Sequence, residues 1–182
     1  MERFLRLKVD GRQSAVDCRA IRAYQRSQII EPANGYAGPI TRNALYWEWA
    51  IYHTKELRGC PKRKGRVVCV ELTHQILWVR QGGKVVAGPF PVRSGRAGYP
   101  TRTGWFRIGT RNKDHWSTLY DSPMPFAQFF SGGQALHGIY GNLYKEPASY
   151  GCVNLRYETA EFLWKKLRKG DRVYVWGRRP GT

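Results

Sequence analysis

The sequence lacks any apolar run approaching the roughly 18 residues that a membrane-spanning helix requires. We therefore expect no transmembrane segment. The first residues, "MERFLRLKVDG", include basic side chains but no apolar stretch typical of a secretory signal. The chain is thus either intracellular or an exported protein from which a targeting segment has been removed. Hydrophobic residues make up 42% of the chain, which suffices for a core and excludes wholesale disorder.

Acidic residues are also scarce, with 13 Asp and Glu against 31 Lys and Arg, for a formal net charge of +18. Such an excess favours a polyanionic partner, namely nucleic acid, an anionic membrane surface or an acidic wall polymer. The basic residues are spread singly, and the longest runs are Lys62–Lys64 and Arg178–Arg179. No recognition helix, zinc-ligand spacing or RNA-binding aromatic motif accompanies them, so we expect no nucleic-acid partner.

Paired CxxC motifs are absent, although the chain has four cysteines. We therefore expect no zinc site, and no other metal or cofactor is expected either. Cys60 and Cys69 flank "PKRKGRVV", a spacing that suits a disulfide in an oxidising compartment and equally suits two free thiols. Cys18 falls in a helical pattern, where we expect a small core residue.

Residues 1–58 predict a small all-α module. Ser14 is a candidate N-cap, and the residues that follow it repeat at the four-residue spacing typical of one helix face. The members of this predicted face are Val16, Ala20, Tyr24 and Gln28, with Ile21 beside them. The helix is expected to end before "EPANGYAGPIT", which is rich in turn-forming residues.

A second helix is expected to begin near Thr41 and to carry "RNALYWEWAIYH". Its aromatic stripe favours packing over ligand binding, and consists of Tyr46, Trp47, Trp49 and Tyr52. The charged segment "KELRGCPKRKGR" then contains glycine and proline and is the best linker candidate. We therefore place the domain boundary between residues 58 and 59.

From Arg66 onward the pattern changes to short segments rich in β-branched and aromatic residues, which predict strands. The expected strands are "RVVCVEL", "QILWVR", "KVVAGPFPVRS", "GWFRIGT", "QALHGIYG" and "DRVYVWG". "QGGK" between the second and third is a strong hairpin signal. One helix is expected around residues 159–167, closed by cations and a glycine. Residues 59–182 thus predict a mostly β domain with one helix after Cys152.

Cys152, within "SYGCVN", is the candidate nucleophile. A cysteine attacks as the thiolate, so it needs a base nearby. Among the four histidines, His53 in the helical part and His74 in a hairpin are expected to be structural. His115 falls in a polar loop, as a surface or a substrate-facing residue. His137 ends an apolar strand 15 residues before Cys152, so these two residues form a candidate catalytic dyad.

The segments around this dyad resemble a known family. "HGIYG" followed by "SYGCVNL", with "TRTGWFRI" and "MPFAQFF" before them, resembles the L,D-transpeptidase catalytic domain, also called YkuD. The similarity runs from roughly Arg66 to Gly177 and is strongest to actinobacterial members. It implies a mostly β fold, a mixed-sheet sandwich or barrel-like arrangement with one helix after the nucleophile loop.

The resemblance implies acyl transfer on peptidoglycan. Cys152 would form a thioester with a stem tetrapeptide, release D-alanine and pass the acyl group on to give a 3→3 cross-link, with an L,D-carboxypeptidase side activity where water is the acceptor. His137 matches the family's base, and Gly138 supplies the carbonyl that orients it. Backbone N–H groups of Tyr150, Gly151 and Cys152 would form the oxyanion site.

Further site residues follow from their positions in the family. Ser149 and Asn154 are expected to organise the nucleophile loop or to contact substrate. A weaker set falls where the family builds a lid or groove wall, with core packing as the alternative: Tyr120, Met124, Phe126 and Phe129. Tyr150 departs from the family, which usually has a second histidine there, and this leaves an active enzyme and a degenerate one as alternatives.

The helical part resembles a second family, the peptidoglycan-binding domain, in shortened form. The matching residues are Asp10–Gly11, Ala20–Ile21, Tyr24–Gln25 and Gly38–Thr41. Together, the two resemblances imply an extracytoplasmic, cell wall-associated protein. The implied partners are peptidoglycan stem peptides and anionic wall polymers, with carbapenem-type β-lactams as inhibitors.

Three other interpretations compete. A sortase also has His before Cys on a β scaffold, and Arg172 would supply its arginine, but its cysteine follows Thr-Leu-x-Thr rather than Ser-x-Gly. A papain-like hydrolase places Cys before His, the reverse of the order here. A non-catalytic protein that binds the wall or another polyanion fits the net charge and the changed residue at Tyr150.

Overall fold

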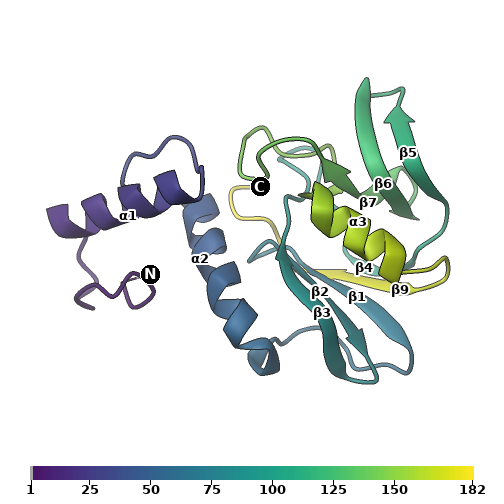
Figure 1. Ribbon diagram of the computed structural model, residues 1–182, viewed down its shortest axis with the longest axis horizontal. Coiled ribbons are helices and arrows are strands. Elements are labelled where there is room, and N and C mark those ends of the chain that lie inside the picture. The colour runs from purple at the N-terminus through teal and green to yellow at the C-terminus, as the bar shows by residue number, and fades with distance from the viewer. Residues whose placement is uncertain (1) are drawn as a thin grey trace.

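The computed structural model describes residues 2–182 and consists of a helical N-terminal part beside a β part (Figure 1). The helical part contains α1 (Ala15–Ser27), α2 (Pro39–Tyr52) and the short 3₁₀ helix η1 (Thr54–Glu56). In Figure 1, α2 lies next to the sheets and α1 lies farther out. No helix within residues 2–182 is long and apolar enough to cross a membrane.

Helix α1 begins after the predicted N-cap, Ser14, whose hydroxyl and backbone exchange hydrogen bonds with Asp17 in a capping box. The predicted buried face is confirmed at Ile21, which is fully buried, and wrong at Val16, which is 56% exposed. The buried residues are Asp17, Ile21 and Gln25. Polar side chains occupy this face because they satisfy nearby backbone groups: Asp17 accepts from Ser14 N at the N-cap, and Gln25 accepts from Gly35 N of the next loop at 2.9 Å.

Helix α2 packs against the β part. It begins at Pro39, slightly earlier than predicted, because the fixed φ of proline suits the first helical position. Trp47 donates its indole N–H to the carbonyl of Pro89 at 3.0 Å, and Tyr46 and Trp49 pack against the apolar cluster beneath the helix. Tyr52 is 85% exposed, so the prediction that the whole aromatic stripe packs is wrong at that residue.

The β part has two mixed sheets, in agreement with the predicted fold class. The first contains β1 (Arg66–Glu71), β2 (Ile76–Gln81), β3 (Lys84–Pro91), β4 (Gly104–Arg107) and β9 (Arg172–Trp176). The second contains β5 (Arg111–Ser117), β6 (Ser122–Ser131), β7 (Gln134–Ile139) and β8 (Val153–Arg156). The strand orders are β3-β2-β1-β9-β4 and β5-β6-β7-β8. Two neighbouring pairs, β1 with β9 and β7 with β8, are parallel.

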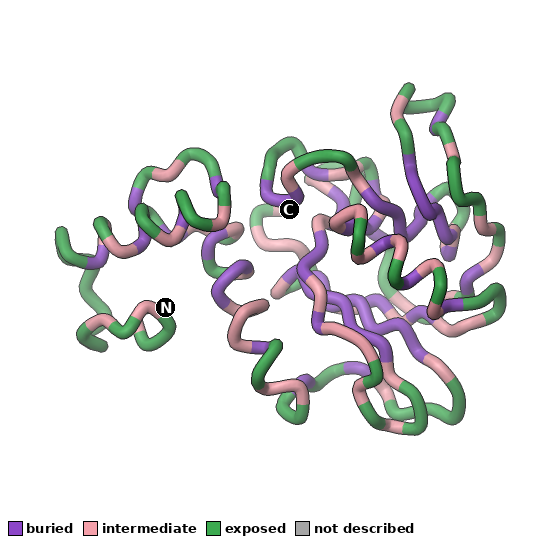
Figure 2. Tube along the Cα trace, viewed as in Figure 1, coloured by how far each residue is buried: buried purple, intermediate pink, exposed green. Residues whose placement is uncertain are grey.

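The main core lies between the sheets and beneath α3 (Tyr157–Lys166), the helix predicted after Cys152. Figure 2 shows buried residues concentrated along the strands, whereas much of the helical part is exposed. Five of the most buried members of the core are Val68, Leu77, Leu136, Leu155 and Leu163. Since each is at most 1% exposed, each contributes most of its apolar surface to stability.

Cys60 and Cys69 form a disulfide, with their Cα atoms 5.7 Å apart. This bond ties the segment after η1 to β1, next to the cluster on which α2 packs. Cys18 is only half-buried and lies outside the buried apolar clusters, so the prediction of a core residue is wrong. Its sulfur instead accepts a hydrogen bond from the amide of Gln13 at 3.3 Å.

Candidate functional site

The candidate site lies on one face of the four-stranded sheet, where β7 and β8 run parallel. Their register places His137 beside Asn154 and Leu136 beside Val153. Because alternate residues of a strand point to opposite faces, Leu136 and Val153 enter the core while His137 and Asn154 point away from it. We call this second face the site face; its residues are Met124, Ala127, Phe129, Ala135, His137, Cys152 and Asn154.

Cys152 immediately precedes β8 and is half-buried on the site face. The backbone N–H of Ala135 donates to its sulfur at 3.4 Å, and the sulfur lies 3.7 Å from the carbonyl oxygen of Gly133. Burial raises the pKa of the Cys152 thiol, and the N–H of Ala135 opposes this only in part. The resting group is therefore a neutral thiol, which must lose its proton to become a nucleophile.

His137 is buried, with both ring nitrogens in hydrogen bonds. Nδ1 lies 2.8 Å from the carbonyl oxygen of Gly138, and Nε2 lies 2.8 Å from the amide nitrogen of Asn154. A carbonyl only accepts, so Nδ1 carries the proton and Nε2 accepts from Asn154. Desolvation lowers the pKa of His137 to about 4, against its ordinary 6.5, and the hydrogen bond to Gly138 only partly offsets this. His137 is therefore a neutral imidazole whose basic nitrogen is Nε2.

Asn154 connects this histidine to a residue that the sequence did not single out. Arg93 donates from Nε to the side-chain oxygen of Asn154 at 3.2 Å. The two residues also exchange backbone hydrogen bonds of 3.0 and 2.9 Å. Arg93 gave no sequence signal because it is one of many singly spaced arginines in a basic chain. Asn154, which was expected to organise the loop, therefore makes a specific contact with His137.

The nucleophile loop is held by short internal contacts. The hydroxyl of Ser149 donates to the carbonyl of Cys152, and the backbone N–H of Gly151 donates to the same hydroxyl at 3.2 Å. Gly151 has a φ of 113°, and a Cβ there would lie 2.4 Å from the amide nitrogen of Gln134. Only glycine fits this position. The N–H of Gly151, expected in the oxyanion site, is therefore committed inside the loop.

Tyr150, the departure from the family pattern, is held on two sides. Its ring stacks on that of Tyr120 with centroids 4.3 Å apart, and the guanidinium carbon of Arg96 lies 3.8 Å from its centroid. Tyr99 meets the same ring edge-on at 4.9 Å. Tyr120 belongs to the turn between β5 and β6, so the tip of this hairpin contacts the nucleophile loop. The aromatic and cation–π contacts hold Tyr150 in place without a histidine.

The remaining members of the predicted groove wall divide into two groups. Met124 and Phe129 pack with Cys152 on the site face. Phe126 does not line a groove; it lies in the main core, 4% exposed, with its ring 5.2 Å from that of Tyr157. Its φ of 56° interrupts the alternation along β6 and turns its side chain inward.

Other candidates lie elsewhere. His115 is on strand β5, not in a loop, and packs edge-on against Phe129 at 5.1 Å. His53 caps α2 and donates from Nδ1 to the carbonyl oxygen of Trp49 at 2.8 Å, and His74 pairs with Glu71, so both are structural.

Arg172, the residue that a sortase mechanism would need, lies on β9 of the other sheet. It donates to the carbonyl of Lys64 at 2.7 Å. Residues 2–182 contain no group of three or more side chains arranged to bind a metal ion. The structure therefore brings together Cys152, His137 and Asn154, and leaves Arg172 outside.

Comparison with known proteins gives a family match. The family YkuD, described as the L,D-transpeptidase catalytic domain, matches residues 65–175. No curated protein sequence matches the chain.

Solved structures give the same assignment. An L,D-transpeptidase (Yku) from Stackebrandtia nassauensis is 38% identical, over 100% of this chain and 91% of that one, with a TM-score of 0.71. An L,D-transpeptidase from Xylanimonas cellulosilytica is 24% identical over 96% of this chain and 90% of that one, with a TM-score of 0.59. L,D-transpeptidase 3 from Mycobacterium tuberculosis, solved with a faropenem-derived adduct, is 20% identical over 62% of this chain and 60% of that one, with a TM-score of 0.55.

Proposed function

Because the chain belongs to the L,D-transpeptidase (YkuD) family, we propose that it forms 3→3 cross-links in peptidoglycan by acyl transfer through Cys152. The sulfur attacks the carbonyl carbon of the third residue of a stem tetrapeptide while its proton passes to Nε2 of His137. The bond to the terminal D-alanine then breaks, the proton leaves with the departing amine, and a thioester remains. An amine of a neighbouring stem attacks that thioester, and its proton returns through His137 to the sulfur.

The observation that carries this proposal is the 2.8 Å contact between Nδ1 of His137 and the carbonyl of Gly138. It leaves Nε2 as the basic nitrogen, on the same sheet face as the sulfur of Cys152. Because thiol and imidazole are both neutral at rest, the proton moves as the sulfur attacks, rather than from a preformed ion pair. Nε2 accepts from Asn154 at rest, so it must exchange that amide for the thiol before the transfer.

The oxyanion of the tetrahedral intermediate needs donors on the nucleophile loop. Since the N–H of Gly151 is directed at Ser149, we assign this role to the N–H groups of Tyr150 and Cys152. Both are backbone groups, so a tyrosine at position 150 can serve as well as a histidine. This supports an active enzyme over a degenerate one.

Release of D-alanine from a tetrapeptide muropeptide tests the proposal. We expect the wild type to release D-alanine and to form a dimer with a 3→3 bond, identified by mass spectrometry, and the Cys152→Ala variant to do neither. Cys18→Ala is the matched control, because Cys18 is the other free cysteine in residues 2–182 and lies in the helical part. Equal release by the wild type and Cys152→Ala would refute the proposal.

A carbapenem provides a second readout that does not require the natural substrate. As a β-lactam adduct is present in the mycobacterial relative, we propose that a carbapenem acylates Cys152 here. We expect one added mass, on the peptide that contains Cys152 and not on that with Cys18. A chain that fails to be acylated, releases no D-alanine and still binds wall material would instead be the non-catalytic binding protein.

Water as the acceptor would give the L,D-carboxypeptidase side activity. The same thioester would then yield a tripeptide stem in place of a dimer. The ratio of tripeptide to dimer, separated by chromatography at several acceptor concentrations, measures this balance. A dimer yield that does not rise with acceptor concentration would argue for hydrolysis as the main reaction.

We further propose that the protein acts outside the cytoplasm, on the cell wall, with residues 1–58 as a wall-binding module. The Cys60–Cys69 disulfide supports an oxidising compartment, and the +18 charge supports attraction to anionic wall polymers. Co-sedimentation of the Cys152→Ala chain with walls, before and after removal of anionic polymers, tests both contributions. Binding that is insensitive to salt and to polymer removal would exclude the electrostatic contribution.

A further inference from the structure

Arg93 is attached to the candidate site at more than one point. It follows β3 and is half-buried, with its guanidinium in contact with the side-chain oxygen of Asn154 and with the carbonyl of Lys145. Its backbone pairs with that of Asn154 in both directions. These contacts fix the position of the Arg93 side chain relative to Asn154.

The donor character of Arg93 determines how the amide of Asn154 is oriented. A guanidinium carries only donors, so the group of Asn154 that faces it must be the carbonyl oxygen. The amide nitrogen is then the atom 2.8 Å from Nε2 of His137, and it can only donate. A rotated amide would place two donors against each other at Arg93. This arrangement leaves an unprotonated Nε2 as the only partner that fits.

We propose that Arg93 is a positioning residue that keeps His137 unprotonated by holding Asn154 in the orientation that donates to Nε2. The inference rests on the proposed function only in naming His137 as the base. Without Arg93 the amide can rotate and offer its oxygen to a protonated Nε2. Both nitrogens of an imidazolium would then have acceptors, Gly138 on one side and Asn154 on the other.

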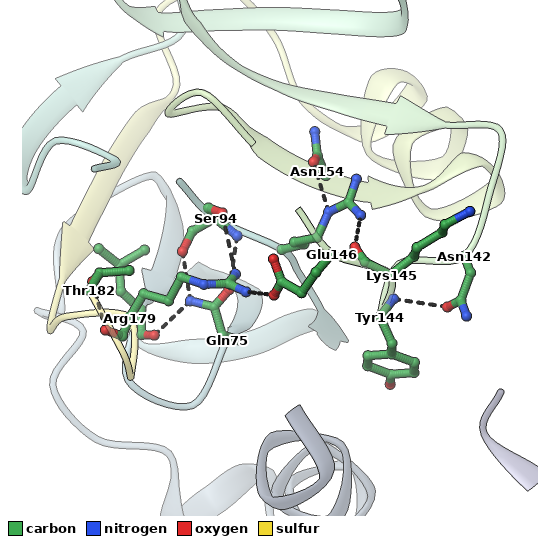
Figure 3. Close-up of polar contacts among 11 residues, drawn as sticks. Gln75, Ser94, Asn142, Tyr144, Lys145, Glu146, Asn154, Arg179 and Thr182 are labelled. Atoms are coloured by element: carbon green, nitrogen blue, oxygen red, sulfur yellow. Dashed lines mark hydrogen bonds and ion pairs between the residues drawn. The ribbon is translucent and has the colours of Figure 1, made fainter. Parts of the chain in front are cut away.

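Arg93 is itself held by a loop that also contacts the helical part. Figure 3 shows Arg179 extending toward Gln75, Ser94 and Glu146, and its contacts include 3.0 Å to the side-chain oxygen of Gln75. Glu146 adjoins Lys145, whose carbonyl accepts from Arg93. The same loop sends Tyr144 into an apolar cluster with residues of α2 and the α1–α2 connection.

The charged and titratable groups that face His137 all fit this assignment. They are Arg93 from the segment after β3 and His115 from β5, and Cys152, just before β8, lies on the same site face. Burial lowers the pKa of His137 most, and its neighbours Arg93 and His115 lower it further. The side chains that β6 contributes to this face are uncharged. Replacing Arg93 by an apolar residue therefore removes both a repulsive charge and the constraint on Asn154.

The experiment titrates His137 directly, by the ring NMR signals of the full chain, in wild type and in Arg93→Met. The His137 signals are assigned by their loss in His137→Gln. We expect Nε2 to be unprotonated in the wild type at neutral pH, and the titration midpoint to rise by about one pH unit or more in Arg93→Met. Arg93→Lys retains the charge and a donor, so it should restore most of the wild-type midpoint. Arg107→Met is the matched control, because Arg107 donates to the carbonyl of Gly170, away from the site face.

The pH profile of Cys152 acylation by a carbapenem gives the functional readout. We expect its acidic limb to move upward in Arg93→Met by the same amount as the NMR midpoint, with an unchanged limb in Arg107→Met. For D-alanine release, kcat of Arg93→Met should fall at acidic pH while KM changes little, because Arg93 acts through Asn154 on His137 and not on the substrate. A residue with only a structural role would lower thermal stability and leave the limb in place.

Two results would overturn the inference: a proton on Nε2 in the neutral wild type, or the same midpoint in Arg93→Met as in the wild type. If Arg93→Met does not fold, Asn154→Asp serves instead, since a carboxylate cannot donate to Nε2 and must raise the midpoint. An unchanged midpoint in Asn154→Asp also overturns it. An inactive wild type with the expected NMR titration would refute the proposed function and support the role of Arg93.

Discussion

The two sheets bury different kinds of side chain. In the five-stranded sheet, β1 and β2 bury mainly apolar side chains, among them Val67, Val68, Val70, Ile76 and Leu77, and Glu71 at the end of β1 is their one buried charged residue. The four-stranded sheet buries apolar residues toward the core but also encloses His137, Asn154 and Gln128. Buried polar groups need specific partners, and those partners restrict where the groups can point. The first sheet therefore supplies stability, and the second uses that stability to hold reactive groups in place.

The largest effect on activity should come from a substitution in the four-stranded sheet. His137→Gln keeps a side chain that can donate or accept but removes the base, so D-alanine release should fall about 10²- to 10⁴-fold. Steady-state kinetics measures the loss, and circular dichroism checks that the fold is retained. His53→Gln, in the helical part, serves as the control and should retain full activity. Activity of His137→Gln within a few-fold of wild type would show that another group takes the proton.

A core substitution in the five-stranded sheet should have the opposite profile. Leu77→Ala removes a side chain that is fully buried, and should lower the free energy of unfolding by about 2–5 kcal/mol. Urea unfolding measures this change, and kcat at a temperature where the protein stays folded should change little. Leu119→Ala, at a residue that is 78% exposed, is the control. A large loss of kcat in folded Leu77→Ala would contradict the assignment of stability to the first sheet and of reactive groups to the second.

Acid should destabilise the protein through the buried histidine. The pKa of His137 is about 4 in the fold against an ordinary 6.5, so below pH 6.5 the unfolded state binds more protons than the folded state. The free energy of unfolding should therefore fall by about 3 kcal/mol as the pH drops from 6.5 to about 4. Below that range His137 should cause no further loss. Urea unfolding at several pH values in wild type and His137→Gln isolates the contribution. An identical acid dependence in both would contradict the neutral burial of His137.

The smallest effect should come from the side chain at position 150. Tyr150→His keeps the backbone donors and should change kcat by less than about tenfold, and Tyr150→Ala should lose the ring contacts at a cost of about 1 kcal/mol in stability. Parallel measurements of kcat, KM and unfolding separate the two contributions. A loss of kcat beyond about 100-fold in Tyr150→Ala, without unfolding, would show that the phenol itself takes part in the reaction.

The same contrast explains what the sequence could predict. All five strands of the first sheet follow from short β-branched or aromatic segments, but only β7 of the second sheet was predicted. Strand β5 consists mostly of exposed polar residues, and β8 has only four residues. Strand β6 contains Pro123 and Pro125, which argue against a strand in the sequence. Both lie in the half of β6 that pairs only with β5, so their missing N–H groups leave no acceptor unpaired on the β7 side.

The site was predictable where chemistry is tied to a motif and not where it depends on distant neighbours. Cys152, His137 and Gly138 follow from local segments and the family resemblance. Arg93 approaches Asn154 through tertiary pairing, 61 residues apart in sequence, and nothing in "PVRSG" indicates it. Phe126 lies in the core, the alternative to a groove wall, because its positive φ turns its side chain inward, and the sequence does not reveal that φ.

The packing of α2 on the first sheet has a practical consequence for preparing a shorter protein. Leu57 and Ala50 are 2% and 0% exposed because they cover the apolar cluster around Trp78. A chain trimmed at the predicted boundary, to residues 59–182, would expose that cluster. It would also remove the hydrogen bond from the Trp47 indole to the carbonyl of Pro89. Such a chain should be poorly soluble and should self-associate, whereas one that starts before Pro39 keeps the cover in place.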